Sequence, residues 1–226
     1  ELRTPIQPIL GGAELIKTKA TNNEQVMISD TIVRNARRLR KLADDILDVS
    51  KIESNTLKLN SQVFDLNELI LDVVKEFSNI NTNQKKKIWF ETGGLNAPYN
   101  VVGDRNRIGQ VLTNLIENSI KFASGEEEED CVIYIGVKET SFDRQVDGDT
   151  GGNFVVVSIK DNGKGIDADM MPRLFTKFTS KSYQGTGLGL YISKSIIEAH
   201  GGKMWARNND DGKGATFSFT LTPRMV

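Results

Sequence analysis

The chain has 226 residues, of which 38% are hydrophobic and 26% are charged. This composition supports one or two folded domains and is too poor in charge for a disordered polyelectrolyte. The 29 Lys and Arg residues nearly balance the 30 Asp and Glu residues, so we expect no basic surface for nonspecific binding of nucleic acid. The single cysteine, Cys131, excludes an internal disulfide and a cysteine-based zinc site.

The start of the chain indicates a piece of a longer protein. It opens with Glu-Leu-Arg-Thr-Pro rather than with Met, and no signal peptide precedes it. No apolar run approaches the roughly 20 residues that cross a bilayer. We therefore expect a cytoplasmic fragment that makes no membrane contact itself, with any membrane anchor of the full-length protein lying upstream.

Residues 1–60 predict an antiparallel helical hairpin. An amphipathic segment covers about residues 1–20, Thr-Asn-Asn at 21–23 interrupts it, and a longer segment covers about residues 24–57. The longer segment has a heptad seam, interrupted by Asn35 and made of Ile28, Ile32, Leu39, Leu42, Ile46 and Val49. Such a helix is roughly 50 Å long, and its shorter partner cannot cover that seam. We expect two hairpins to form a dimeric four-helix bundle, and packing on the rest of the same chain is the alternative.

Residues 61–226 predict an α+β domain. Helices are expected at about 64–77, 104–123 and 190–199, the first with a capped start at Phe-Asp-Leu-Asn-Glu. Strands are expected at 88–92, 99–103, 132–139, 154–161, 203–207 and 216–222. The acidic run 126–130 and the loop 140–153 are expected to be solvated surface. Helices therefore alternate irregularly with mainly antiparallel strands in one layered domain.

The first polar segment is residues 114–122, Asn-Leu-Ile-Glu-Asn-Ser-Ile-Lys-Phe. Asn114 and Asn118 lie one helical turn apart, and Lys121 falls on the same face. A carboxamide oxygen suits Mg²⁺ when phosphates supply the negative charge, and a lysine one turn away suits a phosphate. A solvated polar stripe is the alternative explanation.

Two glycine-rich segments follow. Residues 161–166, Asp-Asn-Gly-Lys-Gly-Ile, come directly after an apolar run, and a carboxylate there is suited to the amino group of adenine and not to the carbonyl group of guanine. An ordinary tight turn is the alternative. Residues 185–190, Gly-Thr-Gly-Leu-Gly-Leu, precede a helix whose N-terminus favours phosphate. Leu190 breaks the dinucleotide pattern G-x-G-x-x-G, and no P-loop sequence occurs.

In this order the segments resemble the nucleotide site of the sensor histidine kinases. Residues 114–122 resemble the asparagine box, residues 161–166 and 185–190 the two glycine boxes, and Leu174, Phe175 and Phe178 the phenylalanine box. Residues 214–217 resemble the closing strand, and residues 1–5 resemble the end of the phosphoacceptor motif. The resemblance implies a dimerisation and histidine-phosphotransfer hairpin at 1–60. It also implies an ATP-binding α/β sandwich at 61–226, with a mixed sheet, about three helices and the Bergerat-type fold of GHKL proteins.

The resemblance also implies roles for individual residues. Asn118 would hold Mg²⁺ with Asn114 nearby, Lys121 would contact the phosphates, and Asp161 would bind the adenine amino group, with Thr216 behind it through a water. Residues 167–184 would form a lid over ATP that carries Lys181. The phosphate end would be bound by Gly185, Gly187, Leu188 and Gly189. The remaining cofactor-binding positions in these boxes are Phe122, Gly163, Gly165, Ile166 and Thr186.

The leading functional hypothesis is an ATP-dependent histidine kinase that passes phosphate to an aspartate of a response-regulator receiver domain. The related ATPases and serine kinases resemble one another in placing a glutamate where this chain has Asn114, and Glu117 lies on another helix face. A neutral imidazole needs no such base. The acceptor histidine would directly precede Glu1. Glu1 would orient and deprotonate it, and Thr4 would align a water for dephosphorylation of the regulator.

Two alternatives to the kinase stay open. One is a GHKL-type ATPase, and the other is a catalytically inactive dimeric scaffold that binds nucleotide. The histidine that the chain does contain, His200, is expected to cap a helix C-terminus instead of taking part in catalysis.

Overall fold

The computed structural model describes residues 6–80, 88–95, 98–123, 130–142, 152–179 and 185–224. The chain divides into two compact units, Glu1–Leu57 with Ser180–Leu188 and Lys58–Thr179 with Gly189–Val226. None of the helices in the described ranges has an apolar stretch of the length that a bilayer crossing requires. In chain order the elements are α1 (Ile6–Thr18), α2 (Asn23–Glu53), β1 (Gln62–Asp65), α3 (Leu66–Ile80), β2 (Ile88–Gly93), β3 (Asn100–Gly103), α4 (Arg105–Ala123), β4 (Cys131–Phe142), β5 (Gly152–Asp161), α5 (Gly189–Ala199), β6 (Met204–Asn208) and β7 (Ala215–Leu221).

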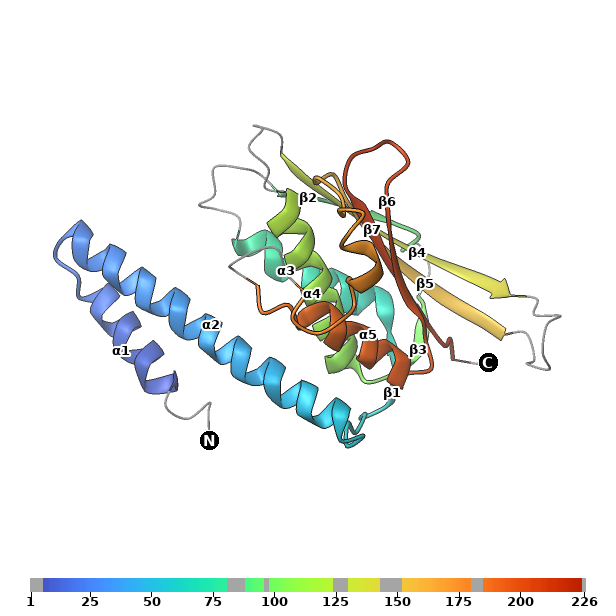
Figure 1. The fold of residues 1–226 in the computed structure, drawn as a ribbon, viewed down its shortest axis with the longest axis horizontal. Coiled ribbons are helices and arrows are strands. Elements are labelled where there is room, and N and C mark those ends of the chain that lie inside the picture. The colour runs from blue at the N-terminus through green and yellow to red at the C-terminus, as the bar shows by residue number, and fades with distance from the viewer. Residues whose placement is uncertain are drawn as a thin grey trace. The chain divides into compact units, whose positions relative to one another are not determined.

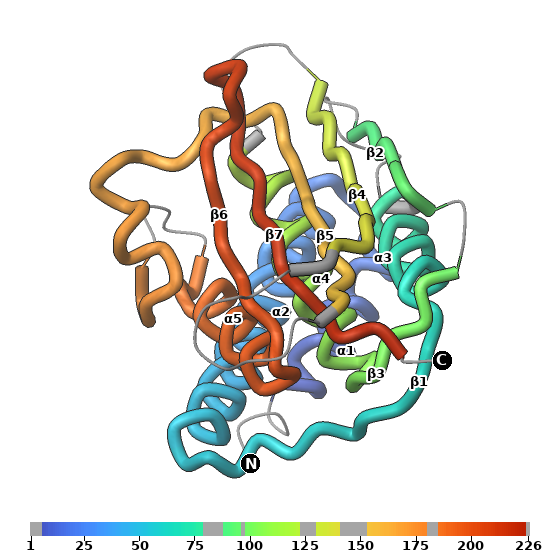
Figure 2. The backbone as a smooth tube through the Cα atoms, turned by 90° about the vertical axis from the view of Figure 1, so that its right-hand side faces the viewer, coloured from blue at the N-terminus to red at the C-terminus, as the bar shows by residue number. Residues whose placement is uncertain are grey.

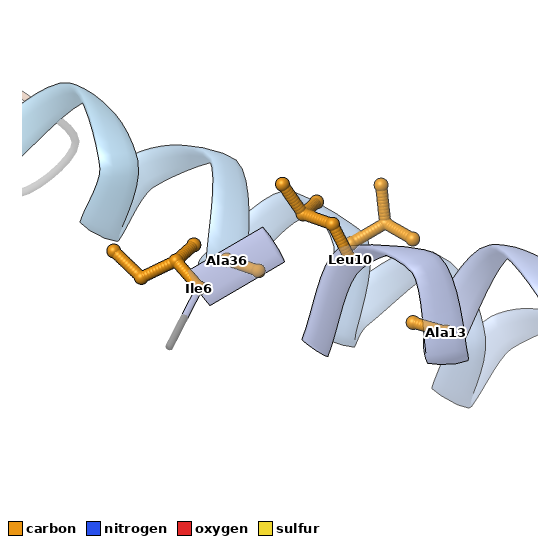
Figure 3. Packing of buried hydrophobic residues seen from close by; sticks show 5 residues of the cluster. Ile6, Leu10, Ala13 and Ala36 are labelled. Atoms are coloured by element: carbon orange, nitrogen blue, oxygen red, sulfur yellow. The ribbon is translucent and has the colours of Figure 1, made fainter. Parts of the chain in front are cut away.

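The first unit contains the predicted helical hairpin. The break comes where the sequence predicts it, because Asn22 has an extended backbone and its side chain accepts the N–H of Gln25 at 2.9 Å, which caps α2. Inside the hairpin, Ile6, Leu10 and Ala13 of α1 pack with Val33 and Ala36 of α2 (Figure 3).

The predicted heptad seam is a different stripe of α2 from the one that pairs with α1. Leu39 is 53% exposed, Ile28 and Ile46 are similarly exposed, and Leu42 and Val49 of the same seam are half-buried. The buried line instead runs through Ser29, Val33 and Ala36, which are small enough for α1 to come close. Helix α2 therefore carries one apolar stripe that its own hairpin uses and a second that the described residues leave open.

The second unit is built on a five-stranded mixed sheet. The strand order is β2-β4-β5-β7-β6, with β2 parallel to β4 and every other pair antiparallel (Figure 2). Helices α3, α4 and α5 lie on one face of this sheet (Figure 1). Alternate residues of β4 from Cys131 to Val137 are buried, including Ile133 and Ile135, and α4 contacts this strand. This confirms the predicted α+β sandwich.

The structure corrects two details of the predicted elements. The segment at Phe64, expected to begin a helix, is the short strand β1, which pairs antiparallel with β3, and Asp65 then caps α3 by accepting the N–H of Asn67 at 2.9 Å. Strands β4 and β5 extend into the predicted 140–153 loop as far as Phe142 and Gly152, because they continue to pair with each other. The rest of that loop, and residues 126–129 of the acidic run, lie outside the described residues.

The start of α4 and the end of α5 are joined through Asp104 and His200. The Asp104 carboxylate accepts the N–H groups of Asn106 and Arg107 at 3.1 Å and that of Asn60 at 2.9 Å. Burial acts to raise the pKa of Asp104, but these three donors outweigh it and hold the pKa below its ordinary value. His200 Nε2 accepts the N–H of Asp104 at 2.9 Å, so Nδ1 carries the proton and donates to the Ile196 carbonyl at 2.7 Å. The predicted capping role of His200 is confirmed.

Candidate functional site

Asp161, the last residue of β5, is a buried carboxylate with two unequal oxygens. The whole residue is only 4% exposed. Oδ1 accepts the backbone N–H groups of Gly163 at 2.9 Å and Ala215 at 3.2 Å, whereas Oδ2, among the described residues, accepts only the Ser119 hydroxyl, at 3.4 Å. Burial raises the pKa of Asp161, and these hydrogen bonds partly offset the rise. Oδ1 is therefore satisfied by the protein, and Oδ2 keeps a lone pair for a donor on a ligand.

Two glycines allow the chain to pass close to Asp161. A Cβ at Gly163 would lie 2.8 Å from the Phe122 carbonyl oxygen and 2.9 Å from Asp161 Oδ1. Gly214 has φ +74°, and a Cβ there would collide with the Asp161 carbonyl oxygen. The first glycine turn and the start of β7 thus enclose the carboxylate from two sides.

Three asparagines that the sequence did not single out hold this turn in place. Asn162 accepts the N–H of Val132 and donates to the carbonyl of Asp130, both at 2.9 Å. Asn209, which is buried, donates to the Asp161 carbonyl at 2.8 Å, and Asn208 bonds the backbone of Ile166. The only sequence signal was the Asn-Asn-Asp-Asp-Gly loop at 208–212, typical of side chains that bond backbone in turns.

The Thr216 hydroxyl is hydrogen-bonded to another side chain, and its predicted contact through a water stays a prediction. Thr216 pairs with Lys160 in the sheet, one residue away from the row that faces the helices, and its hydroxyl donates to Asn209 Oδ1 at 2.6 Å. The backbone N–H of the neighbouring Ala215 reaches Asp161.

The asparagine face of α4 lies between the Asp161 turn and the start of α5. Asn114, 7% exposed, donates to the Gly189 carbonyl at 3.5 Å and to the Ser193 hydroxyl at 3.4 Å. Asn118 is half-buried one turn later on the same face. A carboxamide oxygen in this position fits a Mg²⁺ ion that phosphate oxygens also hold.

Positive charge gathers at the end of α4. The ammonium of Lys121 lies 5.0 Å from the centre of the Phe122 ring, and that of Lys164 lies 5.6 Å from the same centre. The carbonyl of Phe122 also adjoins Gly163. Two ammonium groups therefore lie near the Phe122 ring at the end of α4.

The second glycine segment runs directly into α5. Gly187 has φ +69°, and the Thr186 hydroxyl accepts the N–H of Leu188 at 3.2 Å. The same hydroxyl donates to Asp45 Oδ2 at 2.8 Å within the first unit, where burial raises the pKa of Asp45 and this bond lowers it. The first turn of α5, which starts at Gly189, has no acidic residue, so its N–H groups remain suited to phosphate.

The other predicted positions divide into two groups. Glu1, Thr4 and Lys181 lie outside the described residues. In the predicted phenylalanine box, Leu174 is buried, the Lys194 ammonium lies 5.5 Å from the Phe175 ring centre, and Phe178 is 73% exposed with φ +60°.

Two family profiles match the chain. The histidine kinase-, DNA gyrase B- and HSP90-like ATPase family matches residues 103–225, and the His Kinase A (phospho-acceptor) domain matches residues 1–55. Histidine kinase 5 of Arabidopsis thaliana is 32% identical over 242 residues, covering 98% of this chain and 25% of that protein.

Solved structures agree with these matches. Full-length ShkA in complex with AMPPNP has a TM-score of 0.72 at 24% identity, over 99% of this chain and 44% of that one, and this likeness shows the fold alone. The catalytic domain of histidine kinase ThkA has a TM-score of 0.56 at 34% identity, over 74% of this chain and 96% of that one. The ATPase profile covers more than half of the residues and a phospho-acceptor profile precedes it, so the chain belongs to the histidine kinase-, DNA gyrase B- and HSP90-like ATPase family as a sensor histidine kinase.

Proposed function

We propose that this chain is the ATP-dependent protein-histidine kinase core of a two-component sensor. It spans 25% of Histidine kinase 5 and 44% of ShkA, so the activity proposed is that of the core within a longer protein. The observation that carries the proposal is the Asp161 carboxylate, buried and with one oxygen left for a ligand donor. The cofactor is ATP with Mg²⁺, and use of ATP favours a cytoplasmic location.

The adenine end of the site is expected to be selective. Oδ2 of Asp161 accepts a hydrogen bond from the adenine amino group, while a carbonyl in the same place would face a second acceptor. Gly163 lets the flat base approach the backbone, and Gly165 and Ile166 complete the turn.

The phosphate end is expected to use backbone donors and cations. The N–H groups of residues 185–189 bind phosphate oxygens, and Lys121 adds a positive charge. Asn118 would hold Mg²⁺ through its carboxamide oxygen, and the ion would supply positive charge to offset that of the phosphates. Phosphoryl transfer would break the bond between the γ-phosphorus and the departing oxygen of ADP and form a bond to an imidazole nitrogen, while Glu1 takes the proton from the ring.

Asn114 favours the kinase over the ATPase. A hydrolase needs a base to activate water, but the Asn114 amide donates its protons to the Gly189 carbonyl and the Ser193 hydroxyl. This side chain positions α5 against α4 instead. An imidazole acceptor is nucleophilic without such a base.

The open stripe of α2 supports the proposed homodimer. Ile28, Leu39 and Ile46 follow the heptad spacing and are uncovered within the chain. We retain residues 1–60 as the dimerisation and phosphotransfer domain and residues 61–226 as the catalytic domain. A receiver domain of a response regulator is the proposed partner, and Glu1 and Thr4 keep their proposed roles beside the acceptor.

Labelling with ATP tests the kinase. The protein is extended upstream by its native residues and incubated with Mg-ATP, and we expect a phosphoryl group that is labile to acid and stable to base. Asn118→Ala, which removes the proposed metal ligand, should abolish the label. Steady phosphate release without labelling would instead support an ATPase, and nucleotide binding with neither would support a scaffold.

Sedimentation tests the dimer. Leu39→Glu places a charge in the exposed stripe and should give a monomer, because burying an unpaired carboxylate is unfavourable. Lys51→Glu is the control, since at 100° per residue it lies about 120° around α2 from Leu39. A dimer that survives Leu39→Glu would show that this stripe is not the interface.

A further inference from the structure

We propose that Asn208 and Asn209 are positioning residues that set the selectivity of the site for an amino-bearing purine. The inference rests on the proposed function, because it concerns how Asp161 is aimed at adenine. The two side chains hold the two ends of the six-residue segment 161–166, although Asn208 is the last residue of β6 and Asn209 begins the loop that follows it.

Asn209 fixes the first end of the segment. Its buried amide donates to the Asp161 carbonyl at 2.8 Å and to the Lys213 carbonyl at 2.7 Å, while its oxygen accepts the Thr216 hydroxyl at 2.6 Å. One side chain thus sets the distance between the end of β5 and the start of β7. Its own N–H also donates to the Gly214 carbonyl at 3.1 Å. Both N–H donors of the Asn209 amide and one lone pair of its oxygen are therefore used in hydrogen bonds within the protein.

Asn208 fixes the second end of the segment. Its oxygen accepts the Ile166 N–H at 2.7 Å, and its amide donates to the Ile166 carbonyl at 2.9 Å. This reciprocal pair imitates one rung of a β-ladder. The side chain comes so close that a Cβ at Gly165 would lie 2.9 Å from the Asn208 oxygen.

The backbone that Asn208 and Asn209 hold fixes the orientation of the Asp161 carboxylate. The two donors to Oδ1 are the N–H of Gly163, inside the segment, and the N–H of Ala215, at the start of β7. Asn209 holds Ala215 beside Asp161, and Asn208 holds the turn that carries Gly163. With both donors fixed, the carboxylate cannot rotate, and Oδ2 stays the oxygen that meets the base. If either clamp is lost, the carboxylate gains freedom to turn, and a base with a carbonyl is rejected less strongly.

The test compares ATP with inosine triphosphate, whose base has a carbonyl in place of the adenine amino group. Calorimetric titration of the 226-residue protein gives the ratio of the two affinities. We expect Asn209→Ala to lower the ratio about tenfold and Asn208→Ala by a smaller factor, as the loss of one oriented hydrogen bond implies. A purely structural role would weaken both nucleotides equally and leave the ratio unchanged.

Thr220→Ala is the matched control. Its hydroxyl accepts the Lys203 N–H at 2.8 Å in the same β6–β7 hairpin, but at the end away from Asp161, so the ratio should stay at the native value. Circular dichroism checks folding, and if Asn209→Ala fails to fold, Asn208→Ala decides, because Asn208 is exposed.

Two results overturn the inference. In the first, the native protein prefers ATP but the folded clamp variants keep its ratio, or Thr220→Ala lowers the ratio as much as they do. In the second, the native protein shows no preference for ATP, and then the proposed function fails as well.

Discussion

Replacement of Asp161 by asparagine should reverse the choice of base. The two backbone donors from Gly163 and Ala215 fix which oxygen position must remain an acceptor, so the new side chain keeps its carbonyl oxygen at Oδ1. The amide nitrogen then takes the place of Oδ2 and presents hydrogens to the ligand. The Ser119 hydroxyl can rotate to accept one of them.

The size of the effect follows from two hydrogen bonds. ATP loses the hydrogen bond from its amino group to an ionised acceptor, which is worth about 1.5–3 kcal/mol. The adenine amino group then faces the amide N–H groups of the new side chain, and this unsatisfied contact between donors costs about 1–3 kcal/mol more. Together these costs correspond to a loss of at least about 60-fold in ATP affinity. Inosine triphosphate changes in the opposite direction, because its carbonyl now meets a donor.

The same change should alter stability without ligand. Burial raises the pKa of Asp161 above its ordinary value of 3.8, so its favourable contribution is complete below that value and is lost as pH rises through the folded-state pKa. The asparagine does not ionise, so the Asp161→Asn protein does not lose stability in this way as pH rises. Its free energy of unfolding at pH 7 should equal or exceed that of the native protein. Calorimetry with both nucleotides and urea unfolding from about pH 4 to 7 measure the two effects. Equal weakening of both nucleotides by Asp161→Asn would refute the reasoning.

Three further predictions concern the same unit. Gly214→Ala should cost about 3 kcal/mol in urea unfolding, because a Cβ meets the Asp161 carbonyl, whereas Gly212→Ala, with the same positive φ but open space, should cost about 1 kcal/mol; equal costs would refute the contact. Asn118→Ala should remove the effect of Mg²⁺ on ATP affinity in calorimetry and leave adenosine binding unchanged; a Mg²⁺ effect that persists would exclude this ligand. Hydrogen bonds lower the pKa of Asp104, so its contribution to stability is present above 3.8 and is lost as pH falls through the lower folded-state pKa. In urea unfolding, Asp104→Asn should reduce the fall in the free energy of unfolding at acid pH, and an unchanged fall would contradict the assignment.

Periodic segments were predicted well because their pattern repeats many times. Helix α4 was expected at 104–123 and begins at Arg105, with Asp104 as its cap. The mixed, mainly antiparallel sheet also follows the predicted strands. Strand β1 was missed because four residues show too little alternation, and only pairing with β3 makes them a strand.

Contacts between distant parts of the chain were beyond the sequence pattern. Asn209 bonds the Asp161 carbonyl 48 positions away, and nothing local marks that bond. The bond from Ala215 to Asp161 is made by a backbone N–H, which no side-chain pattern in the sequence marks. Likewise, heptad spacing identified an apolar seam on α2 without telling which of two stripes its own hairpin would use.

The hydrogen bonds of His200 keep this histidine from competing as a phosphoryl acceptor. It is the sole histidine in the sequence, and each of its ring nitrogens already has a backbone partner. A protein of these 226 residues therefore supplies a donor subunit without a competing acceptor. Mixed with an upstream-extended protein whose own nucleotide pocket is disabled by Asp161→Asn, it would yield label only if phosphate crosses between subunits. The two proteins together thus distinguish transfer within a subunit from transfer across the dimer.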